Sequence, residues 1–311
     1  MPSIDDKETI SAAPYKKQIF IIGSGRSGTT LVQRLFNSFP NTMVWGEHAG
    51  FLKEISEAYF TLTQDPKLKE HSYSQKPPDA SDEVIDFYKR PERWQAWNNW
   101  FQPEDINGIF RQYLESIFSP SSLGESVIWG FKEIRYGRND RVIEFLAELY
   151  PEAEFVFVAR NGLNTLESQL TTFRQGESKY LTIKRILQLP TAIKMSIIWS
   201  KQNRHFMKLL DSNKENFHLV HFEKLTVDIH ILAPILNKLG LELGETQFKI
   251  IKMKEGRGSG LDEGLVDQRW KRLGLIPSFI AEVLLGATNE QLGYSVPKHL
   301  IIARSISKIV T

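Results

Sequence analysis

The chain of 311 residues contains no cysteine, and this absence excludes several kinds of chemistry at once. It can form no disulfide, no thiolate zinc site, no iron–sulfur cluster and no cysteine nucleophile. A long apolar run is also lacking, because the longest ones, Ile19–Ile22 and Phe155–Ala159, are too short to cross a bilayer. Acidic residues precede the first apolar run, which is not typical of a signal peptide. We therefore expect a cytoplasmic protein without a membrane partner.

The chain also has little excess charge of either sign. Lys and Arg number 39 against 37 Asp and Glu, which gives a net charge of +2. Such a balance does not by itself argue for or against nucleic acid, and we expect none as a partner. Hydrophobic residues make up 41% of the chain, which is enough for a packed core and excludes wholesale disorder. The oligomeric state stays open.

No linker-like stretch divides the sequence, so its length predicts one large domain. We expect residues 1–17 to form a flexible N-terminal tail, residues 18–300 a single domain, and residues 301–311 a C-terminal tail. Residues 51–126 are rich in charge and aromatic side chains but contain no clear buried strand. They predict a helical insertion on the acceptor side of the domain.

Four apolar segments have the composition of buried strands, namely 18–23, 127–134, 154–159 and 217–222. Between them lie amphipathic patterns that predict helices over 141–149, 161–173 and about 191–210. Strands that alternate with helices indicate a three-layer α/β/α fold with a mostly parallel sheet. Ligands of such sheets bind at the carboxyl ends of the strands, so we expect the chemistry there.

The insertion carries three tryptophans at a spacing of three residues, Trp94, Trp97 and Trp100. These rings either pack the insertion onto the core or form a wall of an acceptor pocket. The spacing alone does not decide between the two interpretations.

The segment Gly23–Thr30 lies between a predicted strand and a predicted helix. Its glycines allow a tight turn, and the amides that open the helix converge at the positive end of its dipole. This predicts a phosphate cradle, the alternative being a turn that only joins strand to helix. Nucleoside triphosphatases carry a lysine where this loop has Thr29, so triphosphate cleavage is disfavoured.

The loop resembles the 5′-phosphosulfate loop of sulfotransferases that use 3′-phosphoadenosine 5′-phosphosulfate (PAPS). In this sequence the loop spans Gly25–Leu31, with Gly25 where proline is common in the family. The motifs most resemble those of the tyrosylprotein and bacterial sulfotransferases. The resemblance implies a sulfotransferase fold related to the P-loop proteins. It also implies that PAPS is bound by Gly25, Arg26, Ser27, Gly28, Thr29 and Thr30.

A second pattern of that family binds the 3′-phosphate of the donor. Arg160 ends a predicted strand and Ser168 follows in the next helix, at the family's separation, although Asn161-Gly162 replaces Asp-Pro. A forked guanidinium and a hydroxyl can converge on one anion. A glycine-rich segment near residue 257 resembles a third donor contact, which makes Arg257 a further candidate.

The resemblance also implies catalytic residues. Glu47 matches the family's base, and its neighbour His48 is an alternative because its ordinary pKa is near neutrality. Lys132 matches a lysine that stabilises charge as the sulfur–oxygen bond breaks, and Arg26 would share that task. No metal is required.

Together these residues predict transfer of a sulfonate group from PAPS to a hydroxyl, in preference to a nitrogen, with release of adenosine 3′,5′-bisphosphate. The lack of a membrane anchor favours a small-molecule acceptor of specialised metabolism. A kinase-type phosphotransferase and a non-catalytic nucleotide-binding protein are the alternatives.

Overall fold

The structure, a computed structural model, describes residues 17–70, 103–119, 128–172, 189–212, 215–252 and 273–310. Within these ranges five parallel strands form one sheet in the order β2-β3-β1-β4-β5. The strands span Gln18–Gly23 (β1), Thr42–Trp45 (β2), Ile128–Glu133 (β3), Glu154–Ala159 (β4) and Phe217–His221 (β5). The predicted parallel α/β sheet is confirmed, with four of its strands close to their predicted limits.

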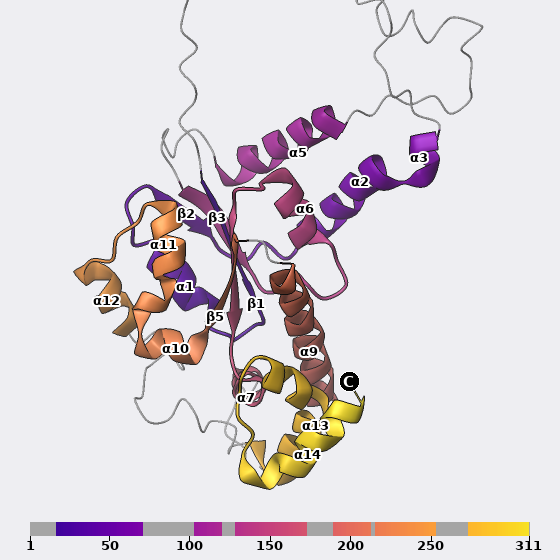
Figure 1. The fold of residues 1–311 in the computed structure, drawn as a ribbon, viewed down its shortest axis with the longest axis vertical. Helices are drawn as coiled ribbons and strands as arrows, with labels where there is room; N and C mark the ends of the chain where they lie inside the picture. Colours follow the sequence, from indigo (N-terminus) through magenta and orange to yellow (C-terminus); the bar gives the residue numbers. More distant parts are fainter. Residues whose placement is uncertain are drawn as a thin grey trace, which may run out of the picture.

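Alternate side chains of the central strands face two separate cores, which makes the fold three layers deep. Ile19 and Ile21 of β1 pack with helices α1 (Thr29–Phe36), α10 (Phe222–Val227), α11 (Ala233–Leu239) and α12 (Glu245–Lys252). Phe20 and Ile22 face the other side, with α2 (Leu52–Gln64), α5 (Pro103–Phe118), α6 (Val142–Leu149) and α9 (Leu189–Asp211). Figure 1 shows these two helical layers on opposite faces of the sheet.

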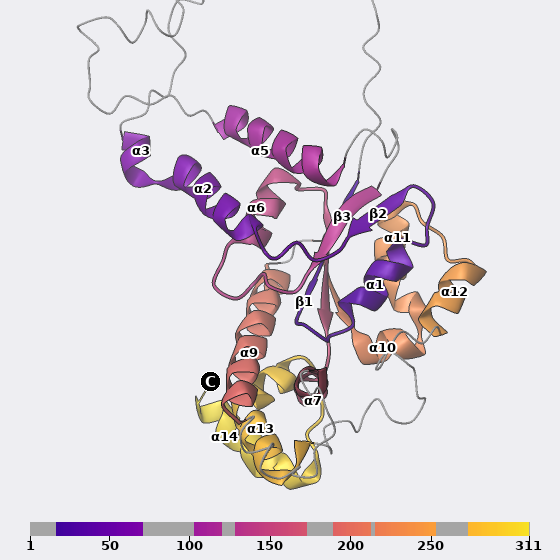
Figure 2. The ribbon, with the colours of Figure 1, turned by 180° about the vertical axis from the view of Figure 1, so that it is seen from behind.

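A third apolar cluster lies beyond the end of the sheet. It joins α7 (Gly162–Thr172), α9 and α13 (Leu275–Gln291), with Leu163, Trp199 and Leu285 in its interior. Figure 2 shows these helices gathered below the strands, opposite α2 and α5. The carboxyl ends of β1, β3 and β4 therefore point toward a helical wall rather than toward open solvent.

The described helices of the predicted insertion are α2, α3 (Pro66–Glu70) and α5. Leu52 begins α2 at the tip of β3, where its amide donates to the hydroxyl of Tyr136, and the helix then runs away from the strand tips. These segments are helical, as the sequence predicts, whereas their place on the acceptor side stays a prediction. Trp94, Trp97 and Trp100 lie outside the described residues, so their role stays a prediction.

Two elements differ from the sequence-based expectation. β2 was not predicted, because it has only four residues at the sheet edge and buries only Val44 fully. Residues 301–311 were expected to be a tail, but Ile301–Val310 form helix α14, which packs on α13. The buried face of α14 carries small or paired side chains, Ala303, Arg304 and Ser307, whereas Ile302 and Ile309 are exposed. The apolar residues therefore repeat at helical spacing, but on the exposed face of α14 and not on the face that packs against α13.

Candidate active site

The predicted cradle is a left-handed turn between β1 and α1. Arg26 has φ 69° and Gly28 has φ 101°, and a Cβ at Gly28 would lie only 2.1 Å from Cδ2 of Phe222. Glycine at this position therefore allows Phe222, the first residue of α10, to pack directly against the loop. Among the residues that the structure describes, no side chain caps α1, so the amides that open this helix stay available to a ligand.

Side chains from three other elements hold the loop in place. Nε2 of Gln169 donates to the carbonyl of Gly25 at 2.9 Å, and Nη1 of Arg160 donates to that of Arg26 at 3.0 Å. The hydroxyl of Ser24 donates to Oε1 of Gln202 at 3.1 Å. These contacts join segments far apart in the sequence and keep the backbone in its turn before any ligand binds.

The predicted residues Arg26, Arg160 and Ser168 lie together. Nε of Arg26 donates to Oγ of Ser168 at 3.2 Å, while the guanidinium of Arg160 lies 4.9 Å above the ring of Phe222. Sequence analysis assigned Arg160 and Ser168 to an anion site apart from the loop. In the structure both adjoin the loop. Arg160 donates to the backbone carbonyl of Arg26, and Ser168 accepts from the Arg26 side chain.

Ser27 lies at the centre of the cradle and is fully buried. Its hydroxyl has no hydrogen-bond partner among the described residues. A buried hydroxyl without a partner is costly, and an anion seated on the loop would provide the missing acceptor. The donor set therefore fits a phosphate group. Thr29 is buried and Thr30 exposed in the first turn of α1, while Arg257 lies outside the described residues.

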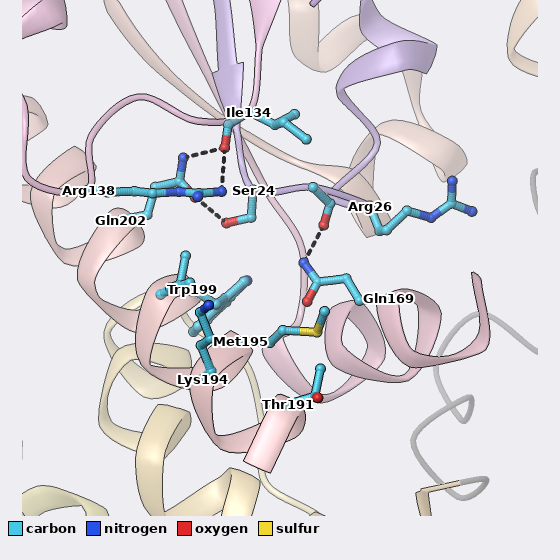
Figure 3. A pocket seen from close by; sticks show the side chains of 12 residues that line it. Ser24, Arg26, Ile134, Arg138, Gln169, Thr191, Lys194, Met195, Trp199 and Gln202 are labelled. Carbon is cyan, nitrogen blue, oxygen red and sulfur yellow. Dashed lines mark hydrogen bonds between the residues drawn. The ribbon is translucent and has the colours of Figure 1, made fainter. Parts of the chain in front are cut away.

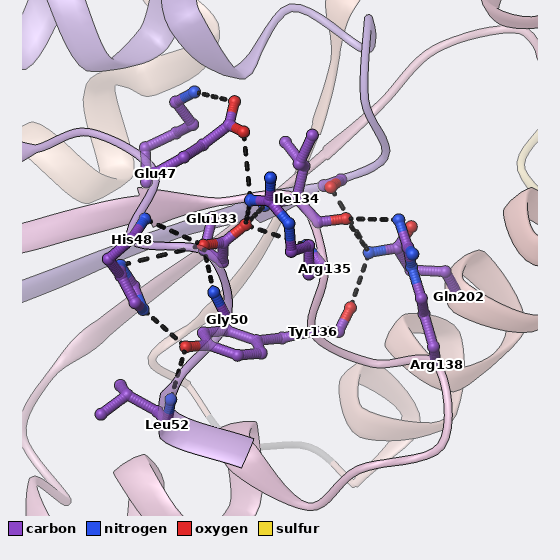
Figure 4. Close-up of polar contacts among 12 residues, drawn as sticks. Glu47, His48, Gly50, Leu52, Glu133, Ile134, Arg135, Tyr136, Arg138 and Gln202 are labelled. Carbon is purple, nitrogen blue, oxygen red and sulfur yellow. Dashed lines mark hydrogen bonds and ion pairs between the residues drawn. The ribbon is translucent and has the colours of Figure 1, made fainter. Parts of the chain in front are cut away.

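The tips of β2 and β3 bring Glu47 and Lys132 into contact. Nζ of the buried Lys132 lies 2.6 Å from Oε1 of Glu47, and Nη1 of Arg135 lies 3.2 Å from Oε2 (Figure 4). Glu47 keeps 33% of its side chain exposed. The carboxylate thus has a cation on each oxygen and remains accessible, as a proton-accepting group near a substrate must be.

Glu133, which follows Lys132 at the end of β3, positions this pair. It is fully buried and accepts backbone N–H bonds from His48, Gly50, Ile134 and Arg135. Burial opposes its ionisation, but these bonds and the guanidinium of Arg135 outweigh that cost and lower the pKa of Glu133. The ionised side chain ties the segment that carries Glu47 to the tip of β3.

His48 points away from the Glu47–Lys132 pair. Its Nε2 lies 2.5 Å from the hydroxyl of Tyr136, and its ring packs edge-on against Phe51, Phe118 and Phe131 (Figure 4). Burial lowers the pKa of His48, more than the charge of Glu133 raises it. The structure therefore brings Glu47 and Lys132 together and leaves the imidazole within an aromatic cluster.

A second network ties the Arg160 turn to the end of the chain. Glu223 accepts from the amide of Asn161 at 3.0 Å and from the hydroxyl of Tyr294 at 2.9 Å. Burial raises the pKa of Glu223 above its usual value. The structure thus joins two segments that lie about 70 residues apart in the sequence.

A cavity of about 460 Å³ lies beside the cradle (Figure 3). Its walls come from the loop, from the end of β3, from α7 and from α9, and it shares Ser24, Gly25 and Arg26 with the cradle. This is a size typical of small-molecule sites. Among the described residues, no cluster of three His, Asp or Glu side chains could hold a metal ion, and none of the helices there is both long and apolar enough to cross a membrane.

Comparison with known proteins gives one family. The model of the Sulfotransferase family matches residues 18–245. Among solved structures, the sulfotransferase domain from the Synechococcus PCC 7002 olefin synthase is 17% identical, with a TM-score of 0.50 over 91% of this chain and 97% of its own. The sulfotransferase domain from the curacin biosynthetic pathway is 15% identical, with a TM-score of 0.49 over 91% and 100%. No curated protein matches the chain.

Proposed function

Because this chain belongs to the sulfotransferase family, we propose that it transfers a sulfonate group from PAPS to a hydroxyl of a small-molecule acceptor. Adenosine 3′,5′-bisphosphate is the second product. The observation that carries this proposal is the contact of Glu47 with Lys132 at the strand tips beside an uncapped phosphate cradle. The predicted membership of the PAPS-dependent sulfotransferase family is confirmed, whereas donor contacts and acceptor are proposed here.

The loop and its neighbours would hold the two phosphate ends of the donor. The amides of Gly28 to Thr30 and the orphan hydroxyl of Ser27 suit the 5′ end, while the Ser27 amide donates to the carbonyl of Ser24 within the loop. Arg160 and Ser168 suit the 3′-phosphate, with Arg257 as a further contact. When bound, PAPS supplies the sulfonate and a phosphate leaving group.

Glu47 would accept the proton of the acceptor hydroxyl as the oxygen attacks. Its carboxylate is anchored by Lys132 and Arg135, so it is held in one orientation while part of it stays exposed. Lys132 and Arg26 would stabilise the negative charge that develops on the departing phosphate. His48, the alternative base, is turned toward Tyr136 and packed among aromatic rings, which favours Glu47 for the proton.

Calorimetric titration with adenosine 3′,5′-bisphosphate and with ATP, each in a metal chelator, tests the donor. We expect the bisphosphate to bind about tenfold or more tightly than ATP, because Thr29 stands where triphosphatases carry their phosphate-binding lysine. Magnesium-dependent binding and turnover of ATP would instead support a kinase-type phosphotransferase. Tight bisphosphate binding with no transfer to any hydroxyl would indicate a non-catalytic nucleotide-binding protein.

A further inference from the structure

The cavity of about 460 Å³ is lined by α9 and by the start of the loop, and Arg160, Ser168 and Phe222 are not part of its lining. Phe222 and Arg160 approach the loop from the α10 side, as the ring of Phe222 against Gly28 shows. The cavity lies on the α9 side, where Gln202 contacts Ser24. Figure 3 shows the Arg26 side chain directed away from the cavity, although its backbone lines the wall. A molecule in this space would touch the loop without occupying the phosphate cradle.

Most of the cavity wall can recognise a ligand only by apolar contact. Ile134, Met195, Ile198 and Trp199 contribute hydrocarbon, sulfur and ring surface. Gln202 is polar but already engaged, because its Nε2 donates to the carbonyls of Ile134 and Tyr136 while its Oε1 accepts from Ser24. The body of the ligand is therefore expected to be apolar.

Two basic side chains interrupt this apolar lining. Arg138 and Lys194 both line the cavity, and neither forms an ion pair with a carboxylate of a described residue. Within the part of the chain that the structure describes, no aspartate or glutamate lines the cavity. Figure 3 shows Arg138, Trp199 and Lys194 along one side and Gln169 with the loop along the other.

The surroundings of Arg138 are unfavourable to its charge. The Arg138 side chain is exposed, but the protein around it displaces part of its hydration. This desolvation, followed by the neighbouring charge of Arg135, lowers the pKa of Arg138, and Asp140 and Glu133 offset only part of this effect. The guanidinium nevertheless stays protonated, as arginine does in proteins. One of its nitrogens, Nη2, donates to the carbonyl of Ile134 at 3.2 Å, which leaves further N–H groups for a ligand. An anion bound here would relieve the uncompensated charge.

We propose that this cavity binds the acceptor, and that the acceptor is a hydroxylated carboxylic acid with an apolar skeleton. The carboxylate would lie between Arg138 and Lys194, and the hydroxyl would face the loop. The assignment rests on the proposed function, since it takes the molecule in the cavity to be the one that receives the sulfonate. Beyond the proposed function, the proposal names the chemical class of the acceptor and two residues, Arg138 and Lys194, that select this acceptor.

The test is a calorimetric titration of the protein saturated with adenosine 3′,5′-bisphosphate. The probes are 10-hydroxydecanoate and 4-(4-hydroxyphenyl)butanoate, each compared with its methyl ester, which keeps the skeleton and removes the charge. We expect at least one acid to bind about tenfold more tightly than its ester, as a charge-assisted bond implies. In Arg138→Gln and in Lys194→Gln that preference should fall about fivefold each, while ester affinity stays unchanged.

Two further variants guard against indirect effects. Arg138→Lys keeps the charge and should keep the preference for the acid, whereas Lys249→Gln, on exposed α12 across the sheet, should change nothing. If no acid binds more tightly than its ester, including the case in which neither binds, the proposal is overturned. If Lys194→Gln and Lys249→Gln reduce the preference for acid over ester equally, the proposal is overturned as well.

The donor assignment can fail separately. If adenosine 3′,5′-bisphosphate does not bind, the preference for acid over ester is measured on the protein without nucleotide, and it still decides whether the cavity selects an anion. If the nucleotide binds and sulfonate is transferred, but acids and esters are used equally, the proposed function stands and the acceptor class is wrong.

Discussion

Two sets of basic side chains lie near the strand tips, and they differ in their partners. Lys132 and Arg135 are ion-paired with Glu47, and Arg135 also pairs with the buried Glu133. Among the described residues, no carboxylate pairs with the second set, Arg26, Arg138 and Lys194. A paired cation holds a carboxylate in position, whereas an unpaired one gains most when a ligand brings an anion. The contrast therefore separates residues that hold Glu47, of which Lys132 is also proposed to stabilise the departing phosphate, from residues whose charge only a ligand would compensate.

The largest effect is expected at the carboxylate of the paired set. Glu47→Gln removes the proton acceptor but keeps the shape, so kcat should fall by about 10²–10⁴ while affinity for adenosine 3′,5′-bisphosphate stays unchanged. Steady-state turnover and calorimetry of the same preparation measure the two quantities. Glu57→Gln, an exposed change on α2, is the matched control. A normal kcat in Glu47→Gln would contradict its role as base.

Glu133→Gln tests whether the paired set is also the structural anchor. The variant loses the buried charge that four amides and Arg135 compensate, so the free energy of unfolding should fall by about 2–3 kcal/mol. Denaturant unfolding at neutral pH measures it, again against Glu57→Gln. No loss of stability would mean that the amides, and not the charge, hold the segment of Glu47.

The same residue predicts a pH dependence. Because the pKa of Glu133 is lower in the folded protein than the 4.5 expected of an ordinary glutamate, the unfolded chain takes up its proton first as pH falls. Stability contributed by Glu133 is thus complete above that value and is lost progressively below it. The free energy of unfolding, measured at successive pH values, should therefore fall less steeply toward acid pH in Glu133→Gln than in the unchanged protein. Parallel curves for the two proteins would contradict the lowered pKa.

Arg160 represents the donor side, where anions are expected from the ligand. Arg160→Ala should weaken binding of adenosine 3′,5′-bisphosphate by about tenfold or more, because a forked guanidinium contact is lost, and should change kcat less than Glu47→Gln does. Arg160→Lys should give an intermediate affinity. Calorimetry provides the dissociation constants. An unchanged affinity in Arg160→Ala would place the 3′-phosphate elsewhere.

The smallest effect is expected at His48. His48→Phe removes the bond to Tyr136 but suits the aromatic cluster around the ring, so kcat should fall by less than about tenfold. The acid limb of the pH–rate profile should keep its position, because the His48 ring contacts Tyr136 and points away from the Glu47–Lys132 pair. Loss of that limb in His48→Phe would transfer the role of base from Glu47 to His48.

The predictable part of the molecule is local in sequence. A buried apolar run, a glycine turn and a helix follow one another at Gln18–Phe36, so the cradle could be inferred from its own residues. Glu47 and Lys132 were found because each follows a short recognisable pattern. What the sequence could not indicate is that the two are in contact, since that depends on how β2 pairs with β3.

The residues that were missed act across long separations. Gln202 lies within a long helix, and its bonds reach the ends of β1 and β3, so nothing beside it in the sequence marks its role. Glu133 lies at the end of an apolar strand. A charged side chain at such a position can indicate a buried, hydrogen-bonded carboxylate. Arg138 and Lys194 became candidates only when the cavity brought them to one side.

A crystal structure with bound adenosine 3′,5′-bisphosphate tests the central claim most directly. The account predicts the 5′-phosphate on the amides of Gly28 to Thr30, with the hydroxyl of Ser27 as a donor, and the 3′-phosphate within hydrogen-bond distance of Arg160 and Ser168. It also predicts that the cavity beside α9 stays open. A nucleotide seated in that cavity, or a 3′-phosphate far from Arg160, would contradict it.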